Sequence, residues 1–254
     1  MSAQRAKDVL KRLLARGPRL YGFVRRTRIV ARYLARRPHE PDFAFFRRYA
    51  GASGLFLDVG GNSGQSALSF RIYQRSAPIL SLEPNPFHRG DLAFVKRLIR
   101  GFDFMICAAG EENGSLTLHV PVHRGIPLTG EASLRPITPE AVHSLGLDPR
   151  AGEVEIAQET VAVKRLDELG LAPQFVKIDV EGFELPVVRG LERTIAEHRP
   201  ILLVETSRTF ADLLDLVGPW GYEPYVYDAD TDALRAYDGT AQNVFLMPNG
   251  ATAR

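Results

Sequence analysis

Short apolar runs alternate along most of this chain with stretches whose apolar residues follow helical spacing. We predict buried strands at residues 55–59, 79–82, 102–106, 175–180 and 201–205, and helices at residues 64–75, 86–100, 183–198 and 208–217. Such alternation is typical of parallel strands joined by crossover helices. Two further apolar runs, at 222–227 and 243–247, flank a turn-forming segment. The pattern therefore predicts an α/β fold with a mostly parallel seven-stranded sheet and helices on both faces.

Two segments depart from this alternation. Residues 115–120 and 154–163 are predicted to form an extra pair of strands, which a proline-rich insertion at about 121–150 separates. Before the first strand, arginines interrupt apolar residues at helical spacing, and Gly17-Pro18 predicts a break between two helices. The predicted organisation is a basic helical N-terminal extension followed by one main domain that carries the insertion: residues 1–50 and 51–254.

The basic character of the chain belongs to its first segment. Residues 1–37 carry twelve Lys or Arg and one acid, Asp8, for a net charge of +11. Since the whole chain carries +2, residues 38–254 carry −9. Three interpretations of the segment stay open: contact with an anionic membrane surface, capture of an acidic substrate, or amphipathic helices that cap the core with a solvated basic face. The third is favoured, because such helices are common and the segment contains no Trp.

Composition excludes several classes of protein. The single cysteine, Cys107, rules out an intrachain disulfide framework and a multi-cysteine metal site. No apolar stretch approaches the roughly 20 residues of a spanning helix, and we find no signal-peptide pattern. We therefore expect a cytoplasmic protein, peripheral to the membrane if the basic segment binds anionic lipid.

The acidic main domain and the lack of a base-flipping loop argue against a nucleic-acid partner. The sequence leaves the oligomeric state open.

A glycine-rich turn follows the first predicted strand. The strand ends near Asp58, and Gly60, Gly61 and Gly64 then allow the backbone to turn sharply and approach a ligand, with Asn62 inside the turn. The spacing Asp-x-Gly-x-x-x-Gly differs from the Gly-x-Gly-x-x-Gly of dinucleotide binders. A carboxylate immediately before the turn suits a ligand that carries a cationic ammonium and sulfonium better than it suits a pyrophosphate.

An acid and a stretch of small residues follow the next two strands. Glu83, before Pro84 and Asn85, lies some twenty residues beyond the glycine turn, where a carboxylate can accept hydrogen bonds from both hydroxyls of a ribose. The small residues 107–109 leave room for a flat adenine. The predicted cofactor-binding residues are Asp58, Gly60, Gly61, Asn62, Gly64, Glu83, Pro84, Asn85, Cys107, Ala108 and Ala109.

Three longer runs occur in a fixed order: LDVGGNSGQSALSF, LSLEPNPF and FVKIDVEGFELPVVRGL. In these runs, and in Asn-Val-Phe-Leu at 243–246, the chain resembles the FkbM family of methyltransferases, from about residue 53 to 206. The resemblance implies a class I methyltransferase (Rossmann-like) fold and S-adenosylmethionine as the methyl donor. It also implies O-methylation of a hydroxyl on a sugar, a glycan or glycolipid, or a natural product.

The acids after the fourth strand are the candidate catalytic residues. In this fold the loop there faces the methyl group, and it contains Asp179, Glu181 and Glu184, while Glu205 ends the neighbouring strand. Asp179 or Glu181 can serve as general base, with a pKa raised by the other carboxylates. Alternatively, Asp179 and Glu205 can ligate a hard divalent cation that binds the acceptor hydroxyl. For Glu184 we also weigh a role as a helix N-terminal acid. The sequence decides neither the base nor the metal.

Two other classes of protein compete with a methyltransferase. An NAD-dependent oxidoreductase shares the fold, but the glycine spacing and the acidic loop count against it. A non-catalytic scaffold at a membrane or partner surface would not need an intact set of site residues. The histidines at 88, 119, 123 and 143 are the usual bases at neutral pH, but we interpret them as surface residues.

Overall fold

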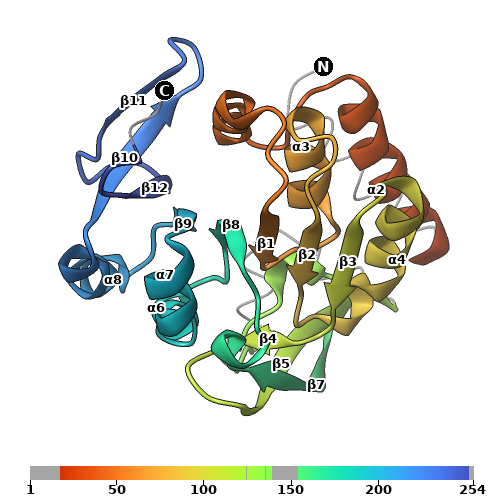
Figure 1. The fold of residues 1–254 in the computed structure, drawn as a ribbon. Coiled ribbons are helices and arrows are strands. Elements are labelled where there is room, and N and C mark those ends of the chain that lie inside the picture. The colour runs from red at the N-terminus through yellow and green to blue at the C-terminus, as the bar shows by residue number, and fades with distance from the viewer. Residues whose placement is uncertain (1–17, 124, 135, 139–153, 252–254) are drawn as a thin grey trace.

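The computed structural model describes residues 18–123, 125–134, 136–138 and 154–251. The predictions for residues 1–17 and for much of the insertion, including His143, lie outside this part of the chain. Figure 1 shows a large twisted sheet flanked by helices and a smaller sheet below it. Among the helices described, none is long and apolar enough to cross a membrane.

The large sheet follows the predicted alternation. Its strand order is β11-β10-β12-β9-β8-β1-β2-β3, with β1, β2, β3, β8 and β9 parallel to one another. The remaining strands pair antiparallel at the end next to β9. The strands are β1 (Leu55–Val59), β2 (Ile79–Leu82), β3 (Phe102–Met105), β8 (Pro173–Ile178), β9 (Ile201–Glu205), β10 (Tyr222–Asp228), β11 (Ala233–Ala236) and β12 (Asn243–Pro248).

The predicted count of seven strands is wrong by one. After the turn at residues 229–232 the chain folds back on β10 as β11, with Tyr225 opposite Ala236. The short β11 is mostly exposed and lacks the apolar run that marks the other strands. It therefore gives no signal that a search for buried strands would detect.

The helices cover both faces of the sheet, as predicted. On β1, Phe56 faces one core, whereas Leu57 and Val59 face the other, because successive side chains of a strand point to opposite faces. The first core includes α3 and α4, and the second includes α6, α7 and α8. The helices are α3 (Gln65–Tyr73), α4 (Arg89–Leu98), α6 (Glu184–Arg189), α7 (Glu192–His198) and α8 (Phe210–Val217), with 3₁₀ turns η2 (Pro86–His88), η5 (Leu166–Glu168) and η6 (Gly218–Trp220).

The single helix predicted over residues 183–198 is two helices. They meet at Gly190, where an added Cβ would lie 2.1 Å from the carbonyl oxygen of Gly110. The backbone of the break thus packs directly on the chain after β4, which requires glycine. Apolar periodicity does not reveal this close approach.

Within the described residues, the N-terminal segment contains α2 (Pro18–Leu34) and continues as the 3₁₀ helix η1 (Pro41–Tyr49). The predicted break at Gly17-Pro18 lies at the edge of these residues. Phe43, Phe45 and Phe46 of η1 are buried in the first core. The ring of Phe46 packs edge-on against Phe56 at a centroid distance of 5.8 Å. Residues 41–49 are therefore part of the packed interior.

The extra strand pair is confirmed and is longer than predicted. It forms a second sheet in the order β4-β7-β5-β6, and Ser133 bridges to His119 at the described edge of the insertion. The strands are β4 (Ala108–Ala109), β5 (Gly114–His123), β6 (Ile126–Pro127) and β7 (Val154–Lys164). The 3₁₀ turn η3 (Thr129–Glu131) follows β6 within the insertion.

Candidate active site

A cavity of about 560 Å³ opens at the carboxyl ends of β1, β2, β8 and β9. Ligands of open α/β sheets bind at this edge, because the connecting loops diverge there. The cavity brings most of the predicted site residues together. Its lining includes Gly60, Asn62, Glu83, Pro84, Asn85, Cys107, Ala108, Ala109, Asp179, Glu181 and Glu205.

The glycine turn lies against the loop after β8. Gly60 has a φ of +92°, and an added Cβ would lie 1.8 Å from the carbonyl oxygen of Asp179. Only glycine tolerates both the left-handed backbone and this contact. Gly61 and Gly64 do not line the cavity: they face Ser81 and Val95, which an added Cβ would approach to 2.8 Å. The turn is therefore shaped by backbone packing on three sides.

Asp58 lies behind the turn, outside the cavity lining. It is fully buried, and its Oδ2 accepts a 2.6 Å hydrogen bond from the hydroxyl of Ser81. Burial raises the pKa of Asp58 to about 6, although the Lys177 ammonium opposes this rise. Direct contact between Asp58 and a cationic ligand stays a prediction.

Glu83 joins the loops that follow β1 and β2. Its Oε2 accepts the backbone N–H of Asn62 at 2.7 Å, and its Oε1 accepts that of Asn85 at 2.8 Å. Burial raises the pKa of Glu83 above its usual value, and these hydrogen bonds offset only part of the rise. Each carboxylate oxygen keeps a further lone pair, so Glu83 can accept two ligand hydroxyls while it holds both loops.

The other end of the cavity suits a flat aromatic group. Cys107, Ala108 and Ala109 are buried and contribute only small side chains to the lining. The side-chain nitrogen of Asn85 is buried without an acceptor among the described residues. Because an unpaired buried donor is costly, a ligand with an acceptor atom at this point would stabilise the site. These features fit an adenosine.

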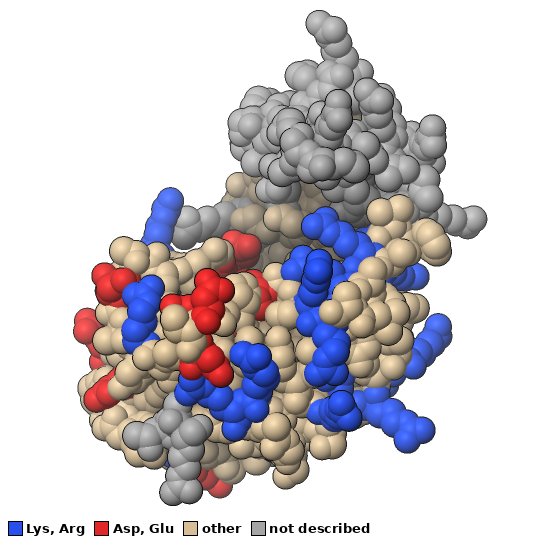
Figure 2. Space-filling model, turned by 90° about the horizontal axis from the view of Figure 1, so that it is seen from above, with Lys and Arg blue, Asp and Glu red and all other residues tan. Residues whose placement is uncertain are grey.

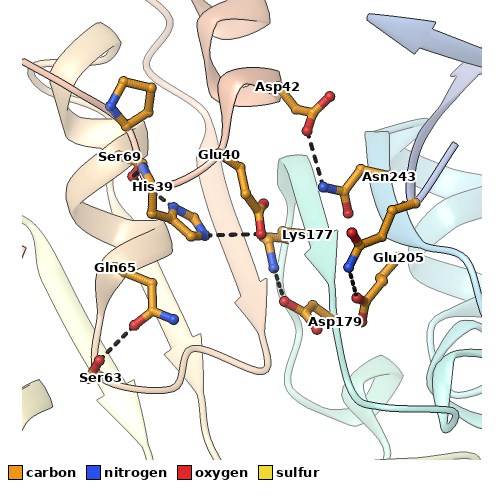
Figure 3. Close-up of polar contacts among 12 residues, drawn as sticks. His39, Glu40, Asp42, Ser63, Gln65, Ser69, Lys177, Asp179, Glu205 and Asn243 are labelled. Carbon is orange, nitrogen blue, oxygen red and sulfur yellow. Dashed lines mark hydrogen bonds and ion pairs between the residues drawn. The ribbon is translucent and has the colours of Figure 1, made fainter. Parts of the chain in front are cut away.

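A buried lysine neutralises the acids of the fourth strand. The Nζ of Lys177 lies 2.6 Å from Oδ2 of Asp179 (Figure 3). Burial opposes both charges, yet each charge stabilises the other. The pKa of Lys177 is raised by Asp179, Asp58 and Glu40, and the pKa of Asp179 is lowered chiefly by Lys177. Asp179 is therefore held as a carboxylate.

Glu205 differs from Asp179 in its state of protonation. Burial, followed by its hydrogen bond to Asp179, raises the pKa of Glu205 to about 7, while the amide of Gln242, which donates to Oε1 at 2.8 Å, opposes the rise. The carboxylate oxygens of Asp179, Glu181 and Glu205 lie within 4.8 Å of one another. The pair of Asp179 and Glu205 can thus hold or release one proton near neutral pH.

The structure adds Glu40, which the sequence analysis missed. Glu40 lies between α2 and η1, lines the cavity and extends toward Lys177 (Figure 3). Beside it, the Nδ1 of His39 lies 2.8 Å from the hydroxyl of Ser69. Burial, together with the charge of Lys177, lowers the pKa of His39 to about 3, so His39 is neutral. No spacing in the sequence relates residues 39–40 to the loop after β8.

Two further interpretations are decided by the structure. Glu184 begins α6 and accepts the backbone N–H of Gly182 at 2.9 Å, so it orders the tight turn before the helix. It is buried and does not line the cavity. The interpretation of His88 as a surface residue is wrong: it is 1% exposed and lines the cavity. His123 is buried as well.

Fold and site together define a class of protein. A glycine turn after the first strand, a buried acid after the second and an acidic loop after the fourth are the parts expected of a class I S-adenosylmethionine-dependent methyltransferase. The chain belongs to the FkbM methyltransferase family, because the model of the methyltransferase FkbM domain matches residues 58–224. No curated protein matches the sequence.

Several solved structures are similar to this chain at low sequence identity. The methyltransferase FkbM from Methylobacillus flagellatus KT is 18% identical, with a TM-score of 0.48 over 76% of this chain and 43% of that chain. The present chain therefore spans less than half the length of that protein. A TehB-like SAM-dependent methyltransferase from Corynebacterium glutamicum is 10% identical, with a TM-score of 0.44 over 89% and 94% of the two chains.

Proposed function

We propose that this protein transfers a methyl group from S-adenosylmethionine to a hydroxyl of a sugar, a glycan or glycolipid, or a natural product. S-Adenosylmethionine supplies an electrophilic methyl carbon on a sulfonium. Glu83 accepts the ribose hydroxyls, and the small residues 107–109 enclose the adenine. Because Glu83 also holds the loops after β1 and β2 through Asn62 and Asn85, the site is ordered before the cofactor binds.

The pair of Asp179 and Glu205 carries the proposal. An alcohol is a poor nucleophile until its proton is drawn off. Glu205, whose pKa is raised to about 7, is partly ionised at neutral pH and can take that proton. Asp179 stays ionised beside Lys177 and stabilises the protonated Glu205 through their hydrogen bond. Glu205 then releases the proton to solvent, since it lines the cavity and is only partly buried.

The same acids also support a second role. Three carboxylates within 4.8 Å of one another suit a hard divalent cation, which would bind the acceptor hydroxyl and lower its pKa. In that case the rate depends on the added ion, whereas proton abstraction by Glu205 does not need it. Transfer that persists in EDTA supports the base, and transfer restored only by magnesium supports the cation.

The first test is calorimetric titration of the protein with S-adenosylhomocysteine, with NAD in parallel. We expect S-adenosylhomocysteine to bind saturably and NAD not to bind. A screen of hydroxylated acceptors by mass spectrometry follows, with Glu205→Gln as the test variant and Glu192→Gln, an exposed change on α7, as the control. We expect methylated product from the control at the wild-type rate and from Glu205→Gln at a much lower rate. Binding of NAD alone would favour an oxidoreductase, and binding of neither ligand would favour a scaffold.

A further inference from the structure

A second cavity, of about 290 Å³, lies between α2 and α3. Its charged lining is basic: it contains Arg25, Arg28, Arg32 and Arg37, and no Asp or Glu of the described residues. His39 also lines it and is neutral, because burial and the charge of Lys177 lower its pKa to about 3. We call this space the arginine cavity. Its charge is thus uniformly positive.

Most of this charge has no ionic partner among the residues that the structure describes. Arg25 shares the buried Asp91 with a neighbouring arginine. Within the part of the chain that the structure describes, Arg28, Arg32 and Arg37 form no ion pair. Like charges held close together repel one another, so the protein gains stability from an anion that binds between them.

Arg32 is fixed in place with one donor left over. Its Nη2 donates to the carbonyl oxygens of Pro38 and His39, at 2.6 and 3.1 Å. Its Nε is buried and has no acceptor among the described residues. A buried guanidinium N–H without an acceptor is costly, and an oxyanion in the arginine cavity would satisfy it. The side chain is therefore positioned for a ligand that accepts hydrogen bonds.

The arginine cavity adjoins the active site. Gln65, at the start of α3, lines both cavities. Arg25 donates from Nη1 to the hydroxyl of Thr129, at 3.2 Å, and Thr129 also lines the active-site cavity. Seen from above, Lys and Arg side chains form a band that faces a group of Asp and Glu side chains (Figure 2). One ligand can therefore reach both charge environments.

We infer that the arginine cavity binds a phosphate group of the methyl acceptor, an inference that rests on the proposed function. Guanidinium groups pair with phosphate oxygens through two parallel hydrogen bonds. The acids Asp179, Glu181 and Glu205 repel the same phosphate. An acceptor is therefore oriented with its phosphate at the arginines and a hydroxyl at the carboxylates. The substrate class is a hydroxylated phosphate ester, either a soluble sugar phosphate or a phosphate-linked lipid.

The test measures anion binding without any need for the true acceptor. The full-length protein is titrated calorimetrically with inorganic phosphate, as wild type and as Arg32→Gln, Arg28→Gln and Arg97→Gln. Arg97 is exposed on α4 and lines neither cavity, so its variant matches the change in charge. Arg28→Gln is needed because Arg32→Gln also removes two hydrogen bonds to the backbone, whereas Arg28 is exposed.

We expect saturable phosphate binding by wild type and Arg97→Gln, and affinity about tenfold lower in Arg28→Gln and Arg32→Gln. Absence of phosphate binding by wild type, or equal affinity in all four proteins, overturns the inference. Titration of the same variants with S-adenosylhomocysteine separates the two proposals, because we expect unchanged affinity there. Phosphate binding without S-adenosylhomocysteine binding in wild type would refute the proposed function and not the anion site.

A second measurement distinguishes the two sources of phosphate. The same proteins are sedimented with phosphatidylcholine vesicles that contain or lack phosphatidic acid. If Arg28→Gln lowers affinity for inorganic phosphate but not for vesicles, the arginine cavity takes a soluble phosphate ester. If it lowers both, the phosphate belongs to a lipid.

Discussion

Two lysine–carboxylate pairs of equal length lie in opposite environments, and they allow the buried charge of the site to be tested. Lys177–Asp179 and Lys96–Asp103 both have an N–O distance of 2.6 Å. Lys177 is 2% exposed, whereas Lys96 is 49% exposed. Lys177→Met keeps the apolar stem of the side chain and removes the ammonium. Asp179 and the fully buried Asp58 then keep their charges without a cation beside them.

The loss of stability in Lys177→Met can be estimated from the burial of the Lys177–Asp179 pair. Removing one member of a buried pair costs about 3–5 kcal/mol, and because Asp179 is 30% exposed we expect the lower end, about 3 kcal/mol. An exposed pair such as Lys96–Asp103 contributes about 0.2–1 kcal/mol. For a chain of this size, 1 kcal/mol corresponds to about 2–4 °C in the thermal midpoint. At pH 8, Lys177→Met should therefore lower Tm by about 6–12 °C, and Lys96→Met by less than about 4 °C.

The pH dependence has a definite sign. In the wild type, Lys177 lowers the folded-state pKa of Asp179, a contribution that is present above the unfolded pKa and lost as pH falls through the folded value. In Lys177→Met that contribution is absent, and burial raises the pKa of Asp179 and Asp58 instead. The variant therefore regains stability as pH falls through those raised values. Thermal unfolding followed by circular dichroism should show that the difference in Tm between wild type and Lys177→Met becomes smaller as the pH is lowered from 8 to 5. Equal losses in Tm in Lys177→Met and Lys96→Met, or a difference in Tm between wild type and Lys177→Met that is larger at pH 5 than at pH 8, would refute this reasoning.

Four further predictions follow from the site and the core. Glu83→Ala should abolish S-adenosylhomocysteine binding in calorimetry without unfolding the chain, because it removes both loop contacts and the ribose acceptor. Gly60→Ala should lower Tm and weaken the same binding, since the new Cβ would meet the carbonyl of Asp179. With the pKa of Glu205 near 7, the rate of methyl transfer should rise about tenfold from pH 6 to pH 8, and Glu205→Gln should remove this dependence. Phe46→Ala should destabilise the fold by about 3–5 kcal/mol in denaturant unfolding.

Each of these predictions has an outcome that contradicts it. Wild-type affinity in Glu83→Ala would remove that residue from the cofactor site. Unchanged Tm in Gly60→Ala would mean that the loops after β1 and β8 do not touch as the structure has them. A flat rate profile in the wild type would exclude Glu205 as the group that titrates. A loss below about 1 kcal/mol in Phe46→Ala would show that η1 is not part of the core.

The sequence by itself determined the fold class and the position of the loops. Alternating apolar runs report which segments are buried on one face or two, and this is a local property of each segment. Parallel strands then place their carboxyl ends at one edge, so Gly60, Glu83 and Asp179 could be assigned to a common site before any coordinates. The acidic loop and the glycine turn were predicted for the same reason. The exposed strand β11 and the break at Gly190 escaped prediction, because neither carries an apolar signal.

Tertiary structure alone decided how the site residues act on one another. Asp58 was placed behind the turn and Glu40 in the cavity by packing between segments far apart in the chain. The ionised Asp179 and the raised pKa of Glu205 depend on burial and on distances to Lys177 and to each other. Such distances are non-local, and electrostatic interactions vary with both separation and surroundings. A sequence therefore names the acids of this site, but only the folded chain decides which of them carries the proton.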